Sequence, residues 1–186
     1  MVPEEEALVN RARAGETAAF NRLVELTQGV VYNVCLRTLG EAEAAADATQ
    51  EAFFAAYRSL NSHRGGSFRA WLLRIAVNQC YDLLRKRKRQ PAEPMDAEAL
   101  EVVDPEPRPD QVALRAETAR AVERAIGQLP LEQRLCVILV DAQGLDYQEA
   151  ARALNVNLGT VKSRLSRARA ELRELIPEEF RPRGGG

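Results

Sequence analysis

The segment from Gln90 to Asp110 places the strongest constraint on how this chain can fold. It contains five prolines, and it carries seven acidic residues against one basic residue. Proline fixes φ and lacks an N–H donor, so a segment this rich in proline continues neither a helix nor a central strand. Acidic residues with few aliphatic neighbours supply no core of their own. We therefore expect residues 90–111 to form an extended acidic linker that divides the chain into two folded parts.

Both parts are patterned as α-helix. Alanine, leucine, glutamate and arginine dominate on either side of the linker, and β-branched alternation is absent. The N-terminal part predicts a four-helix bundle, with helices over residues 5–14, 17–39, 42–60 and 68–88. The C-terminal part predicts helices over residues 112–129, 131–142, 147–154 and 158–175. The expected fold class is all-α, with two small helical domains at residues 1–89 and 112–176 and a disordered tail at 177–186.

The residue inventory argues against metal, disulfide and membrane classes. One histidine, His63, and three widely spaced cysteines supply neither a zinc site nor a disulfide framework. The longest useful apolar stretch, residues 135–140, has six residues, whereas a membrane span needs about eighteen. We expect no metal, no cofactor and no membrane insertion, and the cysteine usage indicates a reducing cytoplasm.

Residues 146–172 carry the pattern of a helix-turn-helix. Asp146 and Glu149 fit a capping box, and Asn155 tolerates the left-handed conformation that a tight turn between helices needs. In the second helix an apolar row with spacings of four, three and four predicts a buried face, formed by Val161, Leu165, Ala168 and Leu172. The opposite face carries polar and basic residues that suit a major groove, namely Thr160, Lys162, Ser163, Arg164, Arg167 and Arg169. A solvated helix with surface arginines is the alternative, but the order of capping box, turn and basic helix favours DNA.

The helix expected at 68–88 offers a second candidate surface. Between two apolar rows, a strip carries Trp71, Arg74, Asn78, Asp82 and Arg85. An aromatic ring and an amide beside arginines suit single-stranded or unstacking DNA, because bases stack on the ring while guanidinium groups meet the backbone. The helix ends in five consecutive cations, residues 85–89. The alternatives are a core role for Trp71 and a solvated basic helix end, and the residues alone leave Trp71 undecided.

The helix expected at 42–60 carries Asp47, Gln50, Glu51 and Phe54 on one side. They lie away from an alanine-rich packing face that the periodicity extends to Tyr57. Spacing alone favours an ordinary solvated face, and a docking surface for a partner is the most that these residues support.

Four stretches together resemble the extracytoplasmic-function (ECF) group of bacterial RNA polymerase sigma factors. They are Asp47-Ala-Thr-Gln-Glu-Ala-Phe53, Phe68-Arg-Ala-Trp-Leu-Leu-Arg-Ile-Ala-Val-Asn78, Leu129-Pro-Leu-Glu-Gln-Arg134 and Gly159-Thr-Val-Lys-Ser-Arg-Leu-Ser-Arg-Ala-Arg169. The resemblance extends over residues 5–175 in the correct order and spacing. It implies a promoter-specificity subunit, with the N-terminal bundle as the region 2 domain and the C-terminal unit as the region 4 domain.

The resemblance also implies roles for individual residues. The residues that would dock on the clamp helices of core RNA polymerase are Asp47, Gln50, Glu51 and Phe54, while the region 4 domain would meet the polymerase flap. The residues that would open and hold the −10 promoter element are Arg64, Ser67, Phe68, Trp71, Arg74, Asn78, Arg85 and Lys86. The loop at 61–67 would capture a flipped base. The residues that would read the −35 element are Thr160, Lys162, Ser163, Arg164 and Arg167.

The implied function is binding without catalysis. Core RNA polymerase, promoter DNA and an anti-sigma factor held between the two domains are the expected partners. An enzyme is disfavoured because the sequence has no P-loop, no GxGxxG motif after a strand and no HExxH motif. A free-standing repressor is the competing hypothesis, but it would need a symmetric dimer, and no dimerising heptad is visible. Three positions depart from the family, since His63 stands where an aromatic is frequent, Asp82 where an amide is frequent, and Ser166 where a larger residue is frequent.

Overall fold

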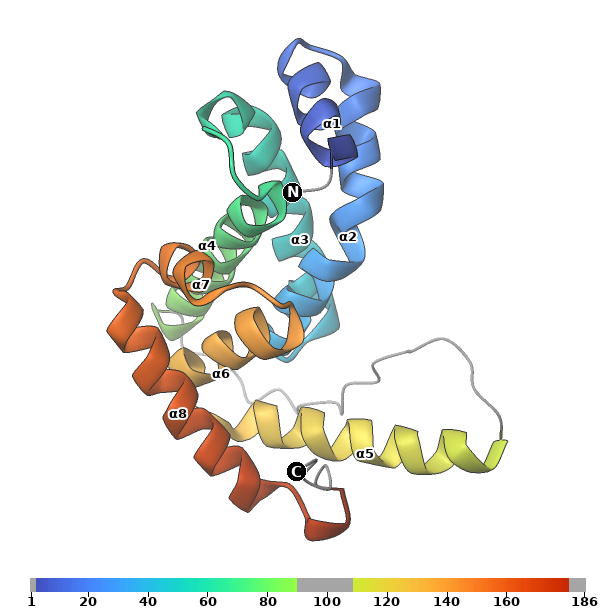
Figure 1. Ribbon diagram of the computed structural model, residues 1–186, viewed down its shortest axis with the longest axis vertical. Helices are drawn as coiled ribbons and strands as arrows, with labels where there is room; N and C mark the ends of the chain where they lie inside the picture. The colour runs from blue at the N-terminus through green and yellow to red at the C-terminus, as the bar shows by residue number, and fades with distance from the viewer. Residues whose placement is uncertain (1–2, 90–108, 181–186) are drawn as a thin grey trace.

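The computed structural model describes residues 3–89 and 109–180, and every regular element in these ranges is helical (Figure 1). The N-terminal part consists of α1 (Pro3–Arg13), α2 (Thr17–Leu39), α3 (Ala42–Ser59), a 3-10 turn (Leu60–Ser62) and α4 (Phe68–Arg89). The C-terminal part consists of α5 (Pro109–Gln128), α6 (Leu131–Val137), a π-helical turn (Ile138–Ala142), α7 (Tyr147–Leu154), α8 (Leu158–Leu175) and a 3-10 turn (Glu178–Phe180). The expected all-α fold class is confirmed. In the described ranges, no helix has the length and apolar character needed to span a membrane.

Local signals in the sequence set the helix ends. Gly40 ends α2 in the left-handed conformation, at φ 75°, and its N–H donates to the carbonyl oxygen of Leu36. Ser67 precedes α4, and its hydroxyl oxygen accepts a hydrogen bond of 3.1 Å from the N–H of Ala70. Both caps are short-range contacts, so the sequence pattern was sufficient to place these boundaries.

Two boundaries expected from the sequence are wrong. Helix α5 begins at Pro109, inside the segment expected to be linker, because proline is well tolerated in the first turn of a helix, where its missing N–H is not needed. Residues 178–180 form a 3-10 turn, although they were expected to belong to a disordered tail. The remaining residues of the predicted linker and tail, 90–108 and 181–186, lie outside the described residues.

Alanine lets the N-terminal helices pack closely. The buried face of α3 is formed entirely by alanines: Ala44, Ala45, Ala48, Ala52 and Ala56. Larger side chains of α2 and α4 fill the space around them, and the most deeply buried include Leu23, Val31, Val34, Leu72, Leu73 and Val77. Burial of each such side chain stabilises the fold by roughly 1.5–3 kcal/mol. The outer faces of α3 and α4 are therefore held on a rigid frame.

The two helical parts dock on each other, a state that we call the closed arrangement. Their buried side chains form one continuous core, with α7 against α4 and α2 against α5 and α6 (Figure 1). Arg37 of α2 and Glu123 of α5 form an ion pair with nitrogen–oxygen distances of 3.0 and 2.5 Å. Arg69 of α4 donates to the side-chain oxygen of Gln143 at 2.8 Å. Charged and apolar contacts together hold the closed arrangement.

Candidate nucleic-acid interface

Helices α7 and α8 form the helix-turn-helix that the sequence predicts. The carboxylate of Asp146 accepts from the N–H of Glu149 at 2.7 Å, and the carboxylate of Glu149 accepts from the N–H of Asp146 at 3.0 Å. Asn155 adopts φ 53° and is the only non-glycine residue of the described chain with positive φ. Asn157 then caps α8 by accepting from the N–H of Thr160 at 2.8 Å. These bonds fix the orientation of α8 relative to α7.

Helix α8 buries one face and exposes cations on the other. Three of the four residues in the predicted apolar row, Val161, Leu165 and Ala168, are buried, and the fourth, Leu172, is partly buried. Lys162, Ser163 and Arg167 are exposed, and the guanidinium of Arg167 has only contacts of 3.3 and 3.4 Å to Ser163. The hydroxyl of Thr160 donates to Asn157 at 3.0 Å and so supports the helix cap. The exposed face of α8 thus carries Lys162, Ser163 and Arg167.

Arg164 differs from the other residues of the predicted −35 surface. Its side chain is only 20% exposed and forms an ion pair of 2.7 Å with Glu132 of α6. Glu132 also accepts from the hydroxyl of Tyr81 of α4 at 3.1 Å. Burial and the Glu132 carboxylate raise the pKa of Tyr81, so its hydroxyl stays protonated and remains a donor. In the closed arrangement Arg164 joins the two domains through Glu132 and Tyr81.

The predicted polar strip lies on the outer face of α4. Arg74, Asn78, Asp82 and Arg85 are exposed, and Trp71 is half-buried. The carboxylate of Asp82 lies 3.6 Å from the guanidinium of Arg85, so the acid that departs from the family faces a cation on its own helix. Because this pair is highly exposed, it holds neither side chain firmly. The strip places a half-buried ring, an exposed amide and the exposed guanidinium of Arg74 on one face of α4.

Phe68 is the clearest correction among the predicted site residues. It was expected to help hold DNA, but it is fully buried. Phe68 begins a row on α4 whose next members, Leu72 and Ala76, are also fully buried, so its ring belongs to the core. The ring centroid lies 5.6 Å from that of Trp71. Phe68 supports Trp71 from behind and does not offer a surface for DNA.

His63 completes an aromatic cluster that the sequence did not reveal. It is 3% exposed, and its ring stands edge-on to Trp71 at a centroid distance of 5.3 Å. Neither ring nitrogen has a hydrogen-bond partner in the described chain. Burial and the nearby Arg13 guanidinium lower the pKa of His63, while Glu5 acts in the opposite sense. A neutral imidazole here takes the packing role of an aromatic ring.

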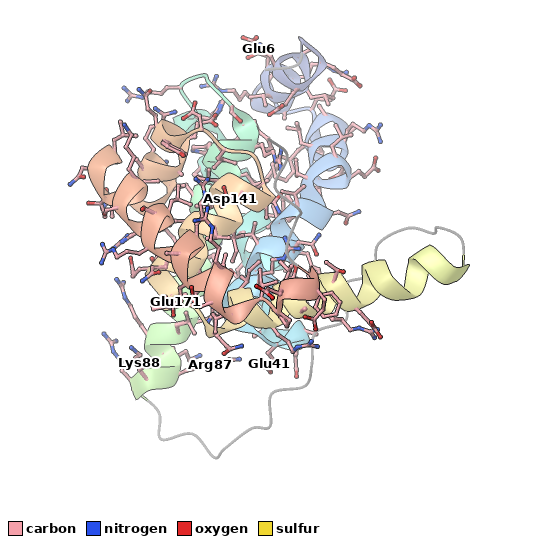
Figure 2. All side chains as sticks on the ribbon, turned by 60° about the horizontal axis from the view of Figure 1, so that its bottom comes forward. Glu6, Glu41, Arg87, Lys88, Asp141 and Glu171 are labelled. Atoms are coloured by element: carbon pink, nitrogen blue, oxygen red, sulfur yellow. The ribbon has the colours of Figure 1, made fainter. Side chains whose placement is uncertain are left out.

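The basic end of α4 is only partly neutralised. Arg87 forms an ion pair with Glu41, next to the start of α3, and Figure 2 shows the two labelled residues side by side. Lys86, Lys88 and Arg89 are exposed and form no ion pair within residues 3–89 and 109–180. The expected DNA residue Lys86 is therefore accessible. Upstream of α4, Arg64 is exposed, whereas the hydroxyl oxygen of Ser67 is occupied by the helix cap.

A separate face of α3 exposes polar side chains together with an aromatic ring. All four residues that the sequence placed there, Asp47, Gln50, Glu51 and Phe54, are exposed, and Phe54 is 51% exposed. Tyr57, which the periodicity assigned to the packing face, is 50% exposed, with its ring edge-on to Phe20 at 4.9 Å. Phe54 and Tyr57 are three residues apart on α3, a spacing that places two side chains next to each other on a helix surface. The helical spacing did not predict that Tyr57 is exposed, because this residue lies at the border between the packing face and the polar face of α3.

Comparison with known families gives two matches, one in each helical part. The sigma-70 region 2 family matches residues 23–90, and the sigma-70 region 4 family matches residues 119–172. The chain is 40% identical over 164 residues to the ECF RNA polymerase sigma factor SigM of Mycobacterium tuberculosis, covering 88% of this chain and 80% of that protein. It is 36% identical over 187 residues to the ECF RNA polymerase sigma-E factor of Escherichia coli, covering 96% and 95%.

Two solved structures are similar over both helical parts. The sigma factor RpoE in complex with the anti-sigma factor NepR from Bartonella quintana has a TM-score of 0.71 at 26% identity, covering 84% of this chain and 95% of that chain. CnrH in complex with the cytosolic domain of CnrY has a TM-score of 0.68 at 29% identity, covering 92% and 96%. Coverage this wide includes elements from each domain.

Proposed function

This chain belongs to the extracytoplasmic-function group of RNA polymerase sigma factors, and we propose that its two domains contact two separate promoter elements. The region 2 domain, ending at residue 89, recognises and opens the −10 element. The region 4 domain, from α5 to α8, reads the −35 element. Phosphate contacts position each domain and base contacts supply the specificity.

The observation that carries this proposal is the exposed strip on α4. Trp71 is propped by the rings of His63 and Phe68, while Arg74 and Asn78 stand free on the same face. A firmly supported ring can receive an unstacked base, and a free guanidinium can meet the phosphate beside it. On α8 the corresponding residues are Lys162, Ser163 and Arg167, whose exposure suits direct readout in the major groove.

Two protein partners follow from the same surfaces. The exposed face of α3, with Asp47, Gln50, Glu51 and Phe54, docks on the clamp helices of core RNA polymerase, and the region 4 domain meets the flap. An anti-sigma factor controls the protein by binding both domains. Support for this control comes from the two similar solved structures, in which the sigma factor RpoE is bound to the anti-sigma factor NepR and CnrH to the cytosolic domain of CnrY.

The closed arrangement limits how the two domains can reach promoter DNA. Helix α7 packs on α4 beside the strip, and Arg164 is tied to Glu132 and through it to Tyr81. Two promoter elements that lie apart along DNA cannot both be reached while the domains are docked. The protein therefore opens when it joins polymerase, acts in the cytoplasm, and supplies binding energy without any catalysis of its own.

Reconstitution with core RNA polymerase tests the proposal. Run-off transcription from a responsive promoter should require this chain, and Trp71→Ala should spare recruitment to duplex DNA while suppressing permanganate reactivity of thymines at the −10 element. Trp71→Phe, which keeps an aromatic ring, is the matched control and should retain opening. Failure to initiate at any defined start point, or tight specific binding of the isolated chain as a dimer, would support the repressor hypothesis instead.

A further inference from the structure

Where α7 meets the loop before α4, the two domains enclose a cavity of about 410 Å³. The N-terminal domain contributes Arg64, Trp71 and Arg74 to its lining, and α7 contributes Glu149 and Arg152. Small-molecule sites have volumes of about 300–1,000 Å³ and combine a few polar groups with an aromatic or apolar wall. The cavity has the volume of such a site, its lining is richer in charged residues, and it needs both domains because each contributes part of the lining.

The cavity carries uncompensated positive charge. Arg64, Arg74 and Arg152 line it, and none of them forms an ion pair or a side-chain hydrogen bond with the described residues. The single carboxylate of the lining, Glu149, accepts the N–H of Asp146 at 3.0 Å, so one negative charge stands against three positive ones and the lining keeps an excess of positive charge. Three exposed guanidinium groups that line one space favour the entry of an anion. Arginine forks match the geometry of phosphate oxygens.

The loop wall of the cavity is bare backbone. Gly65 and Gly66 line it with φ values of 88° and 84°, and a Cβ built on either would meet no heavy atom within 4 Å. Two consecutive glycines in this conformation let a ligand approach the main chain closely. Ser62 and Ser67 also line this wall, and the hydroxyl oxygen of Ser67 is the one that caps α4. This wall suits a phosphate group better than an apolar ligand.

Trp71 supplies an aromatic surface to the same cavity. It is the only tryptophan of the chain, and the rings of His63 and Phe68 hold it at centroid distances of 5.3 and 5.6 Å. An indole held in this way offers a flat surface on which a purine or pyrimidine stacks. Phosphate-binding cations beside a stacking ring define a nucleotide and not a simple inorganic anion.

We propose that this cavity binds a nucleoside polyphosphate, with its phosphates on Arg64, Arg74 and Arg152 and its base on Trp71. Because Arg152 joins the site only when the domains are docked, the nucleotide stabilises the closed arrangement. The inference rests on the proposed function in one respect: Trp71 and Arg74 also receive the unstacked promoter strand, so nucleotide and promoter compete for them.

Fluorescence of the single tryptophan tests the proposal on the full-length protein. Titration with GTP and with ATP should quench the Trp71 emission to saturation, while inorganic tripolyphosphate should displace the nucleotide without quenching. Arg152→Ala should weaken GTP binding by about tenfold or more, since it removes one charge-assisted contact. The matched control is Arg120→Ala, an exposed arginine of α5 that forms no ion pair with described residues; it should leave the affinity within about twofold.

Three outcomes would overturn the proposal. They are the absence of saturable quenching, equal effects of the Arg152 and Arg120 substitutions, and a single-stranded −10 oligonucleotide that loses affinity in Arg152→Ala as strongly as GTP does. The last result would make the cavity part of the promoter surface. Promoter opening by the holoenzyme is followed separately, by permanganate without added nucleotide, and Arg152→Ala should open the promoter normally there. A wild-type protein that never opens a promoter would refute the proposed function and leave the GTP titration unaffected.

Discussion

The ion pair between Arg37 and Glu123 offers a direct way to open the closed arrangement. It joins α2 to α5 through two nitrogen–oxygen contacts of 3.0 and 2.5 Å, and the two side chains are only 17% and 12% exposed. Glu123→Gln removes the negative charge and leaves Arg37 uncompensated at the domain boundary. Breaking a buried pair costs about 3–5 kcal/mol, and the partial exposure here favours the lower end. Since 1.4 kcal/mol corresponds to a tenfold change, about 3 kcal/mol shifts the closed–open equilibrium by roughly 100-fold.

Amide hydrogen exchange of the full-length protein measures this shift. Glu123→Gln should accelerate exchange in α7 and in the part of α4 that it covers, and it should raise the affinity of the isolated chain for a single-stranded −10 oligonucleotide. The charge reversal Arg37→Glu with Glu123→Arg should restore protection. Glu16→Gln is the matched control, because the Arg11–Glu16 pair lies within the N-terminal domain with side chains 58% and 42% exposed. Unchanged α7 exchange in Glu123→Gln would refute the claim that this pair holds the domains together.

Three further predictions concern single positions. Arg167→Ala should weaken promoter binding by about 1–3 kcal/mol at one −35 base pair without lowering the melting temperature. Arg164→Ala should lower the melting temperature, because Glu132 loses its ion-pair partner and retains the hydrogen bond from Tyr81. Binding to a panel of −35 variants and thermal denaturation distinguish the two substitutions. Burial lowers the pKa of His63 below its unfolded value of about 6.5. The free energy of unfolding should therefore be insensitive to this group above that pH and should fall as the pH drops below it. Denaturant unfolding of the wild type and of His63→Phe across this pH range tests the expected decrease. Asn155 adopts the left-handed conformation, so Asn155→Ala should cost about 1–2 kcal/mol while Asn155→Gly should cost less, as chemical denaturation would show.

Much of the fold could be read from the sequence because its signals are local. A capping box, a glycine at a helix end or an apolar row spaced by three and four involves residues within one or two turns. The spans Thr17–Leu39 and Tyr147–Leu154 match those expected, and the residues of the α3 face lie exposed as the pattern indicated. The same logic placed Pro109 in the linker, since a proline that starts a helix and a proline that prevents one look alike in sequence.

Only the tertiary structure decided the roles of residues that look equivalent in the sequence. Arg164 and Arg167 occupy one basic face of α8, yet only Arg164 has an acid opposite it, from a helix that precedes it by about thirty residues. Phe68 and Trp71 are neighbouring aromatic residues on α4, but Phe68 is fully buried and supports Trp71, which remains partly exposed. The ion pair between the domains joins Arg37 and Glu123, which lie 86 residues apart. Hydrophobic periodicity and caps are properties of one segment, whereas ion pairing and burial depend on which distant segment lies opposite, and that follows only from packing the whole chain.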